Sequence, residues 1–151
     1  MYKTILVPLD GSERAEIIFD HVEELASHYG ATIVLLRVVE LPMTLDSSYT
    51  GLPHLTADDI RQRMENAKVY LSGLAEKLED KGIPARTYVE FGPVATVIVE
   101  TAEREGADLI AMASHGRSGL PGVYYGSVAA AVLQRVDRPL LIVRSLERES
   151  I

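Results

Sequence analysis

A glycine-rich segment at residues 114–127, SHGRSGLPGVYYGS, has the clearest potential for chemistry in this sequence. It contains four glycines within eleven positions. Because glycine has no Cβ, its backbone amide can approach a phosphate closely. A helix that starts at Gly126 and Ser127 would add free N–H groups and a partial positive charge. The segment therefore predicts either a phosphate or other anion site, or a structural connection in which Ser127 simply caps a helix.

Three further residues are candidates for binding or catalysis. Arg117 is the fixed cation within the glycine-rich segment, and His115 precedes it by two positions. A general base needs a partner that orients it, and no such partner for His115 is evident in the sequence. Asp10 follows the first apolar run and precedes Gly11 and Ser12. We expect Asp10 to bind a ligand or to cap a helix, a role for which Ser12 competes, rather than to catalyse a reaction.

The motifs of several enzyme classes are absent from the sequence. It has no Gly-x-Ser-x-Gly nucleophile elbow and no Gly-x4-Gly-Lys-Ser/Thr phosphate loop. No Gly-x-Gly-x-x-Gly fingerprint follows the first apolar run, which argues against a dinucleotide fold. No cluster of His, Asp or Glu at metal-ligand spacing is visible, and there is no cysteine. We therefore expect no catalytic residue and no metal site made by the protein.

The elements that must position these residues alternate along the chain. Apolar runs at residues 4–9, 31–39, 108–113 and 140–143 predict buried strands, and the alternation at residues 85–91 predicts a half-buried one. Apolar residues at helical spacing predict helices between them, closed by Gly30, by residues 81–82 and by Gly106. The order is therefore β-α-β-loop-α-β-α-β-α-β. Such an order indicates an α/β fold with a parallel sheet covered by helices on both faces.

Topology indicates where a ligand would bind. Five strands in this pattern most often take the order 3-2-1-4-5 or 2-1-3-4-5. Ligands of open α/β sheets bind beyond the carboxyl ends of the strands, where the winding direction reverses. With the order 3-2-1-4-5, this crevice lies between the first and fourth strands, so it is formed by residues 9–12 and 113–127. The long stretch at residues 41–55, which includes His54, is a candidate cover for the crevice.

Length and charge limit the functional class further. The chain has 151 residues, which fits one domain, expected at residues 1–145 with a tail at 146–151. Its formal net charge of −7 argues against general nucleic-acid binding, because phosphate backbones repel an acidic protein. No run approaches the roughly 18 apolar residues of a membrane span. We expect a cytoplasmic protein.

Several motifs resemble the universal stress protein family. Residues 5–12, ILVPLDGS, resemble its first strand and turn, and residues 36–38, LRV, resemble the end of its second strand. The family's nucleotide-binding members carry Gly, two residues, Gly, nine residues, Gly and then Ser or Thr. Gly116, Gly126 and Ser127 match this spacing, while Ala113 stands at the position of the first Gly. The resemblance implies a single Rossmann-like domain similar to the adenine nucleotide alpha hydrolases, with strand order 3-2-1-4-5.

The resemblance also implies a ligand and a site. The ligand would be ATP, ADP or AMP, with Mg²⁺ or Mn²⁺ held by the phosphates. Asp10 would lie near the ribose, and the backbone of Val38 would meet the adenine edge. The full set of residues implied in nucleotide binding is Pro8, Leu9, Asp10, Val38, Met112, Ala113, His115, Gly116, Arg117, Gly126, Ser127 and Val128.

Two functional interpretations stay open. The first is a nucleotide-binding regulatory dimer of the stress response, which pairs through the apolar edge strand at residues 140–143. The second is a nucleotide-free dimeric interaction protein, which Ala113 favours because its methyl group stands where a close approach to the nucleotide is needed. A slow ATPase is a third, weaker alternative.

Overall fold

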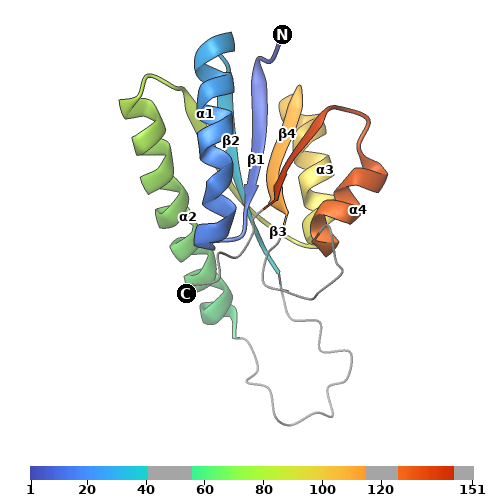
Figure 1. Ribbon diagram of the computed structural model, residues 1–151. Coiled ribbons are helices and arrows are strands. Elements are labelled where there is room, and N and C mark those ends of the chain that lie inside the picture. Colours follow the sequence, from blue (N-terminus) through green and yellow to red (C-terminus); the bar gives the residue numbers. More distant parts are fainter. Residues whose placement is uncertain (41–55, 115–125, 145–151) are drawn as a thin grey trace, which may run out of the picture.

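Five parallel strands form one sheet at the centre of the molecule (Figure 1). The computed structural model describes residues 1–40, 56–114 and 126–144; the expected cover at 41–55 and the expected tail at 146–151 lie outside these residues. The strands are β1 (Thr4–Leu9), β2 (Thr32–Val39), β3 (Ala85–Phe91), β4 (Leu109–Ser114) and β5 (Leu140–Arg144). Their order is β3-β2-β1-β4-β5, which confirms the predicted fold class and selects the first of the two expected topologies.

The three central strands are almost wholly buried because both of their faces are covered. In β1 the side chains of Ile5, Leu6 and Val7 are fully buried, and four consecutive residues of β2 are buried as well. Parallel strands that are buried on both faces are expected to be nearly continuous apolar runs. The in-line register of β1 with β2, in which Leu9 pairs with Arg37, brings their carboxyl ends to the same edge.

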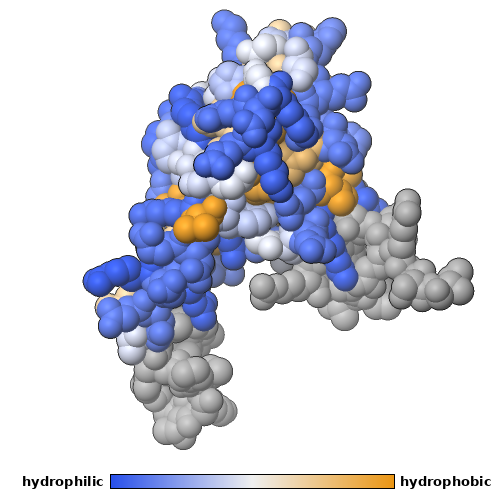
Figure 2. All heavy atoms as spheres, turned by 90° about the vertical axis from the view of Figure 1, so that its left-hand side faces the viewer, coloured by the Kyte–Doolittle hydropathy of each residue, from blue (hydrophilic) through white to orange (hydrophobic). Residues whose placement is uncertain are grey.

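Four α-helices cover the two faces of the sheet. Helices α1 (Ile18–Tyr29) and α2 (Ala57–Asp80) pack on one face, around a buried cluster that includes Leu35 and Leu71. Helices α3 (Val94–Glu105) and α4 (Ser127–Arg135) pack on the other face, around Leu36 and Ile98. The outer side of the α1–α2 layer is largely hydrophilic (Figure 2). The alternation of apolar and charged residues therefore produces two separate cores, one on each side of the sheet.

Local signals determine where the helices begin and end. Thr56 and Asp59 form a capping box at the start of α2, and these hydrogen bonds with Thr56 lower the pKa of the Asp59 carboxyl. Gly30 ends α1 in the left-handed conformation, with φ of 67°. One element differs from expectation: residues 13–17 form a short 3-10 helix, η1 (Glu13–Ile17), rather than the first turn of α1. The apolar spacing alone does not distinguish these two helix types.

Helix α2 extends past the carboxyl ends of the strands (Figure 1). Its buried residues begin only at Ala67 and continue through Leu71, Leu74 and Leu78. The preceding turns, which contain Ile60 and Met64, are not fully buried. The first turns of α2 therefore form a wall beside the end of the sheet, instead of only covering its face.

The opposite, amino end of the sheet is closed by hydrogen bonds. The Asp108 carboxylate accepts from the backbone N–H groups of Lys3, at 2.7 Å, and Thr4, at 3.0 Å. These two bonds lower the pKa of Asp108. Arg138 donates to the carbonyl oxygens of Ala102 and Ala107, at 3.0 and 2.8 Å. The amino end of β1 is thereby tied to the start of β4, and the end of α3 to the segment before β5.

The two edge strands differ in character. β5 consists of Leu140, Leu141, Ile142 and Val143 followed by Arg144, and its apolar residues are half-buried. β3 instead exposes charged residues, and Glu90 and Arg86 pair there with Arg104 and Glu105. Charges along an edge discourage pairing with another chain. No helix of the described residues is long and apolar enough to cross a membrane.

Candidate functional site: a cleft at the carboxyl end of the sheet

A cleft of about 1040 Å³ opens where the strands end. It lies beside the junction of β1 and β4, where the chain order along the sheet reverses. Its walls come from the ends of β1, β2 and β4, from α2, and from the amino ends of α3 and α4. The lining residues among the described parts are Pro8, Leu9, Asp10, Gly11, Ala15, Leu36, Arg37, Val38, Val39, Glu40, Arg63, Asn66, Ala67, Tyr70, Val94, Ile98, Met112, Ala113, Gly126, Ser127, Val128 and Ala129.

The turn after β1 holds Asp10 in a defined position. Its Oδ1 accepts from the backbone N–H of Ser12 at 2.8 Å and from the Ser12 hydroxyl at 2.5 Å. The Ser12 hydroxyl in turn accepts from Ala15 N, at 3.2 Å, and so caps η1. Of the two expected helix-capping residues, Ser12 therefore performs the capping, and Asp10 orients it. Asp10 is left at the cleft surface as a charged acceptor.

The Arg37 guanidinium, which comes from the end of β2, lies against the same turn. A Cβ placed on Gly11 would stand 3.5 Å from Arg37 Nη2 and 3.6 Å from Arg37 Cζ. Gly11 has φ of 84°, a conformation that residues with a side chain rarely adopt. A glycine at this position thus permits the sharp turn, whereas a Cβ would only make an ordinary van der Waals contact with the guanidinium.

Tyr70 extends the cleft wall from α2. Its hydroxyl oxygen is buried and has no hydrogen-bond partner of good geometry among the described residues. Burial raises the pKa of Tyr70 to about 12, and the negative charges of Glu16 and Asp10 add to this rise, whereas Arg37 opposes it. The Glu16 side chain also contributes to this rise as a hydrogen-bond partner, although its geometry does not satisfy the hydroxyl.

The amino end of α4 forms another part of the wall. Gly126 is the cap residue and Ser127 is the first helical residue, with no side-chain hydrogen bond at this end. The alternative role of Ser127 as a helix cap is therefore wrong, because it stands one position too late to cap the helix. The first backbone N–H groups of a helix lack intrahelical partners. Such groups at a helix amino end favour anions, and Ser127 lines the cleft beside them.

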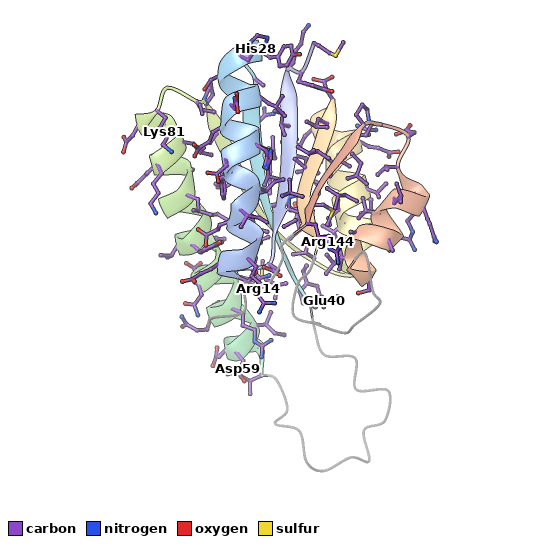
Figure 3. The ribbon with its side chains drawn as sticks, viewed as in Figure 1. Arg14, His28, Glu40, Asp59, Lys81 and Arg144 are labelled. Carbon is purple, nitrogen blue, oxygen red and sulfur yellow. The ribbon has the colours of Figure 1, made fainter. Side chains whose placement is uncertain are left out.

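Ala113 and Ser114 end β4 at the bottom of the cleft. Ala113 lines the cleft, while the Ser114 side chain is buried and its hydroxyl has no partner among the described residues. In Figure 3, Arg14, Glu40 and Asp59 are at the cleft end of the molecule, and His28 and Lys81 are at the opposite end. Of these labelled residues, Glu40 lines the cleft.

Comparison with known proteins assigns the family. A model of the universal stress protein family matches residues 1–144. The chain belongs to this family. It is 30% identical to the universal stress protein MJ0577 of Methanocaldococcus jannaschii, over 95% of this chain and 96% of the relative. The solved structure of MJ0577 superposes with a TM-score of 0.82 and covers 98% of this chain and 99% of its own.

Two other solved universal stress proteins have nucleotide ligands. One is in complex with cAMP; it is 21% identical and has a TM-score of 0.64 over 96% of this chain and 98% of its own. The other, from Archaeoglobus fulgidus, is in complex with dAMP; it is also 21% identical, with a TM-score of 0.62 over 93% of this chain and 97% of its own. At this identity the likeness shows the shared fold. The universal stress protein fold therefore accommodates adenine nucleotides in these two relatives.

The structure brings most of the predicted site residues of this universal stress protein to one cleft. Pro8, Leu9, Asp10, Val38, Met112, Ala113, Gly126, Ser127 and Val128 all line it. The other three, His115, Gly116 and Arg117, lie outside the described residues. Within the described ranges, no group of three or more His, Asp or Glu residues is arranged to hold a metal ion.

Sequence reasoning missed the wall that α2 and the end of β2 contribute. Arg63, Asn66 and Tyr70 recur at helical spacing and resemble an ordinary solvated helix face. One signal was present for Arg37: it is the charged residue in the otherwise apolar run TIVLLRVV, and an unpaired charge is costly inside a sheet. Such a residue indicates a strand end that opens onto a polar cleft.

Proposed function

We propose that this universal stress protein binds an adenine nucleotide in the cleft and acts as a cytoplasmic regulatory dimer of the stress response. ATP, ADP and AMP are the candidate ligands, with Mg²⁺ or Mn²⁺ held by the phosphates. Binding changes the surface around the cleft and hence its affinity for a partner protein. The cytoplasmic location is proposed from the sequence composition alone.

One observation carries the proposal. The cleft combines an acceptor, Asp10, with the amino end of α4, and both face the same space at the point where the strand order reverses. An acidic side chain suits ribose hydroxyls, and a helix amino end suits phosphates. The complexes of two other family members with cAMP and dAMP support the same ligand class.

Release of bound small molecules from the purified protein tests the proposal directly. The protein is denatured, and the supernatant is separated by anion exchange with detection of adenine absorbance. We expect an adenine nucleotide at close to one per chain, or saturable binding of Mg-ATP after the protein is stripped of ligand. The absence of binding at millimolar Mg-ATP would reject the proposed ligand.

A nucleotide-free interaction protein is the second candidate, and Ala113 favours it. Its methyl group lies on the wall of the cleft, where the nucleotide-binding members of the family have glycine. If the protein fails to bind Mg-ATP, Ala113→Gly distinguishes the two functions. Gain of nucleotide binding in this variant would identify the methyl group as the obstacle, whereas continued failure would favour the interaction protein.

Dimerisation is proposed through β5. This edge strand offers half-buried apolar residues and no charge before Arg144, unlike the charged edge at β3. Antiparallel pairing of two β5 strands would cover the apolar edge of both copies. Sedimentation at micromolar concentration is expected to give a dimer mass. Leu141→Lys should convert the dimer to a monomer, and a wild-type monomer would contradict this part of the proposal.

A further inference from the structure

The wall formed by α2 and the end of β2 carries polar groups that the proposed nucleotide site does not use. Arg37 comes from β2, and Arg63, Asn66 and Tyr70 come from α2. This wall packs on the sheet face opposite to α4, so it is distinct from the anion site at the α4 amino end. A ligand that fills the cleft meets cationic or donor groups on both sides.

Arg37 stands directly beside Asp10. The register pairs Arg37 with Leu9, the residue before Asp10. The guanidinium lies over the backbone of Gly11, the residue after Asp10, with Nη2 3.5 Å from the point that a Cβ on this glycine would occupy. One acceptor and one cation therefore face the cleft from neighbouring strands.

An acidic residue and an arginine that lie side by side are both suited to contact the ribose of a nucleotide. In dinucleotide-binding folds, either an acidic residue binds the free 2′ hydroxyl of the ribose, or a nearby arginine accommodates a phosphate at this position. Arginine suits this role because its planar donors match phosphate oxygens in pairs. In this chain both residue types are present side by side, and Arg63 and Asn66 add a second cation and an amide donor.

We propose that Arg37, assisted by Arg63 and Asn66, binds a phosphate on the ribose, so that the cleft takes adenine nucleotides phosphorylated at the 2′ or 3′ position. This inference rests on the proposed function and names its substrate class more closely. The cleft volume of about 1040 Å³ is slightly above the roughly 300–1000 Å³ of typical ligand sites. The two arginines offset the negative charges of Asp10 and Glu40, which also line the cleft.

Isothermal titration of the full chain with four ligands tests the subsite. AMP is the reference, and adenosine 2′,5′-bisphosphate and adenosine 3′,5′-bisphosphate carry the extra phosphate on the ribose. ADP is the matched control, because it adds a phosphate to the 5′ chain instead. We expect one of the two bisphosphates to bind at least tenfold more tightly than both AMP and ADP, which corresponds to about 1.4 kcal/mol. The preferred isomer identifies the phosphorylated hydroxyl.

Two variants and a matched control test whether the preference for a bisphosphate over AMP comes from this wall. Arg37→Gln is expected to bring the ratio of the AMP and bisphosphate dissociation constants close to one. Arg63→Gln should reduce the ratio by about threefold, because this exposed arginine supplies a solvent-screened charge. Arg61→Gln is the matched control on the same helix; its side chain is 76% exposed, pairs with Asp58 at 3.7 Å and does not line the cleft. It should keep the wild-type ratio.

Each outcome bears on the subsite or on the proposed function separately. Equal binding of AMP and both bisphosphates overturns the subsite and leaves the proposed function intact, as does a preference that persists in Arg37→Gln. Failure of every adenine nucleotide to bind overturns both. Thermal unfolding checks that Arg37→Gln is folded. If it is not, the exposed Arg63→Gln variant is used instead. An unchanged ratio of the AMP and bisphosphate dissociation constants in Arg63→Gln would then overturn the subsite.

Discussion

The two ends of the sheet differ in how their polar groups are satisfied. At the amino end, the Asp108 carboxylate accepts from two backbone N–H groups, and Arg138 donates to two carbonyl oxygens. At the carboxyl end, the buried hydroxyls of Tyr70 and Ser114 have no partner of good geometry among the described residues. At the amino end, the buried Glu105 Oε1 also lacks a hydrogen bond, but it forms an ion pair with Arg86 Nε at 3.9 Å. Both ends belong to the same strands, so the difference comes from the connections and side chains placed at each end.

This difference separates stability from binding. Buried polar groups in proteins are almost always hydrogen-bonded, and exceptions need an explanation. Polar groups that leave their bonding capacity unused around a cleft can bond to a ligand instead. The amino end should therefore contribute to the free energy of unfolding and the carboxyl end to ligand affinity, and substitutions at the two ends should affect different measurements.

The largest expected effect is on stability, from Arg138→Met. This variant removes the donor to the carbonyl oxygens of Ala102 and Ala107 but keeps most of the apolar stem. Because hydrogen bonds from a charged group are worth about 1.5–3 kcal/mol, we expect the free energy of unfolding to fall by about 2 kcal/mol. Urea unfolding measures this change. Nucleotide affinity should stay at the wild-type value.

Arg135→Met is the matched control for this substitution. Arg135 makes one exposed hydrogen bond, to Thr96 Oγ1 at 2.8 Å. Its loss should change the free energy of unfolding by no more than about 0.5 kcal/mol. Equal destabilisation by the two variants would contradict the assigned role of Arg138 at the amino end.

Asp10→Asn and Asp108→Asn compare the same substitution at the two ends. Asp10→Asn keeps an oxygen that can accept from Ser12 but loses the charge that faces the cleft. We expect it to weaken adenine-nucleotide binding about tenfold, because a hydrogen bond to a charged acceptor is lost. Asp108→Asn should leave the affinity unchanged. Equal affinities for both variants, measured by titration calorimetry, would contradict the division between the two ends.

The sequence predicted the part of the cleft formed by the ends of β1 and β4 and by α4 better than the wall formed by α2 and the end of β2. Gly126 and Ser127 were identified because glycines followed by a helix start form a local signal, and Asp10 because it follows a buried strand. Arg63 and Asn66 carry no such signal, since their position depends on how far α2 extends past the sheet. The capping box at Thr56 determines where α2 begins, but which of its turns project past the sheet depends on where the helix packs, from Ala67 onward.

The fold was predictable for a related reason. Each strand of the sheet is a short apolar run, and most helices end at a glycine or begin at a cap residue. Hydrophobic periodicity and these boundary residues were therefore enough to predict the elements. The alternation of strands and helices alone reduced the expected strand orders to two, 3-2-1-4-5 and 2-1-3-4-5. The 3-10 geometry of Glu13–Ile17 was missed because apolar spacing does not distinguish one short 3-10 segment from the first turn of an α-helix.

Stability at low pH tests the Asp108 contacts at the amino end. Hydrogen bonds from Lys3 and Thr4 hold the pKa of Asp108 below its ordinary value of about 3.9. A carboxylate with a depressed folded-state pKa stabilises the fold above the unfolded-state pKa and loses this contribution as the pH falls through the folded-state pKa. Wild type should therefore exceed Asp108→Asn by about 1 kcal/mol at pH 7, a value that allows for solvent screening.

The difference between these two proteins should shrink as the pH falls below about 4. Urea unfolding at a series of pH values from 7 to 2 measures it. A difference that stays constant down to pH 2 would mean that the Asp108 charge contributes nothing and that the variant acts through packing alone.

Tyr70→Phe has the smallest expected effect and the opposite sign. The Tyr70 hydroxyl is buried without a partner of good geometry, so the folded state bears the cost of its desolvation. Its removal should leave the ligand-free protein as stable as wild type, or more stable by up to about 1 kcal/mol. Glu16 is the residue that would reverse this result, because its negative charge already raises the Tyr70 pKa. If urea unfolding shows Tyr70→Phe to be less stable by 1 kcal/mol or more, the hydroxyl donates to Glu16 in solution. The α2 wall would then be satisfied within the protein, as the amino end is, and the contrast between the two ends would rest on Arg37 and α4 alone.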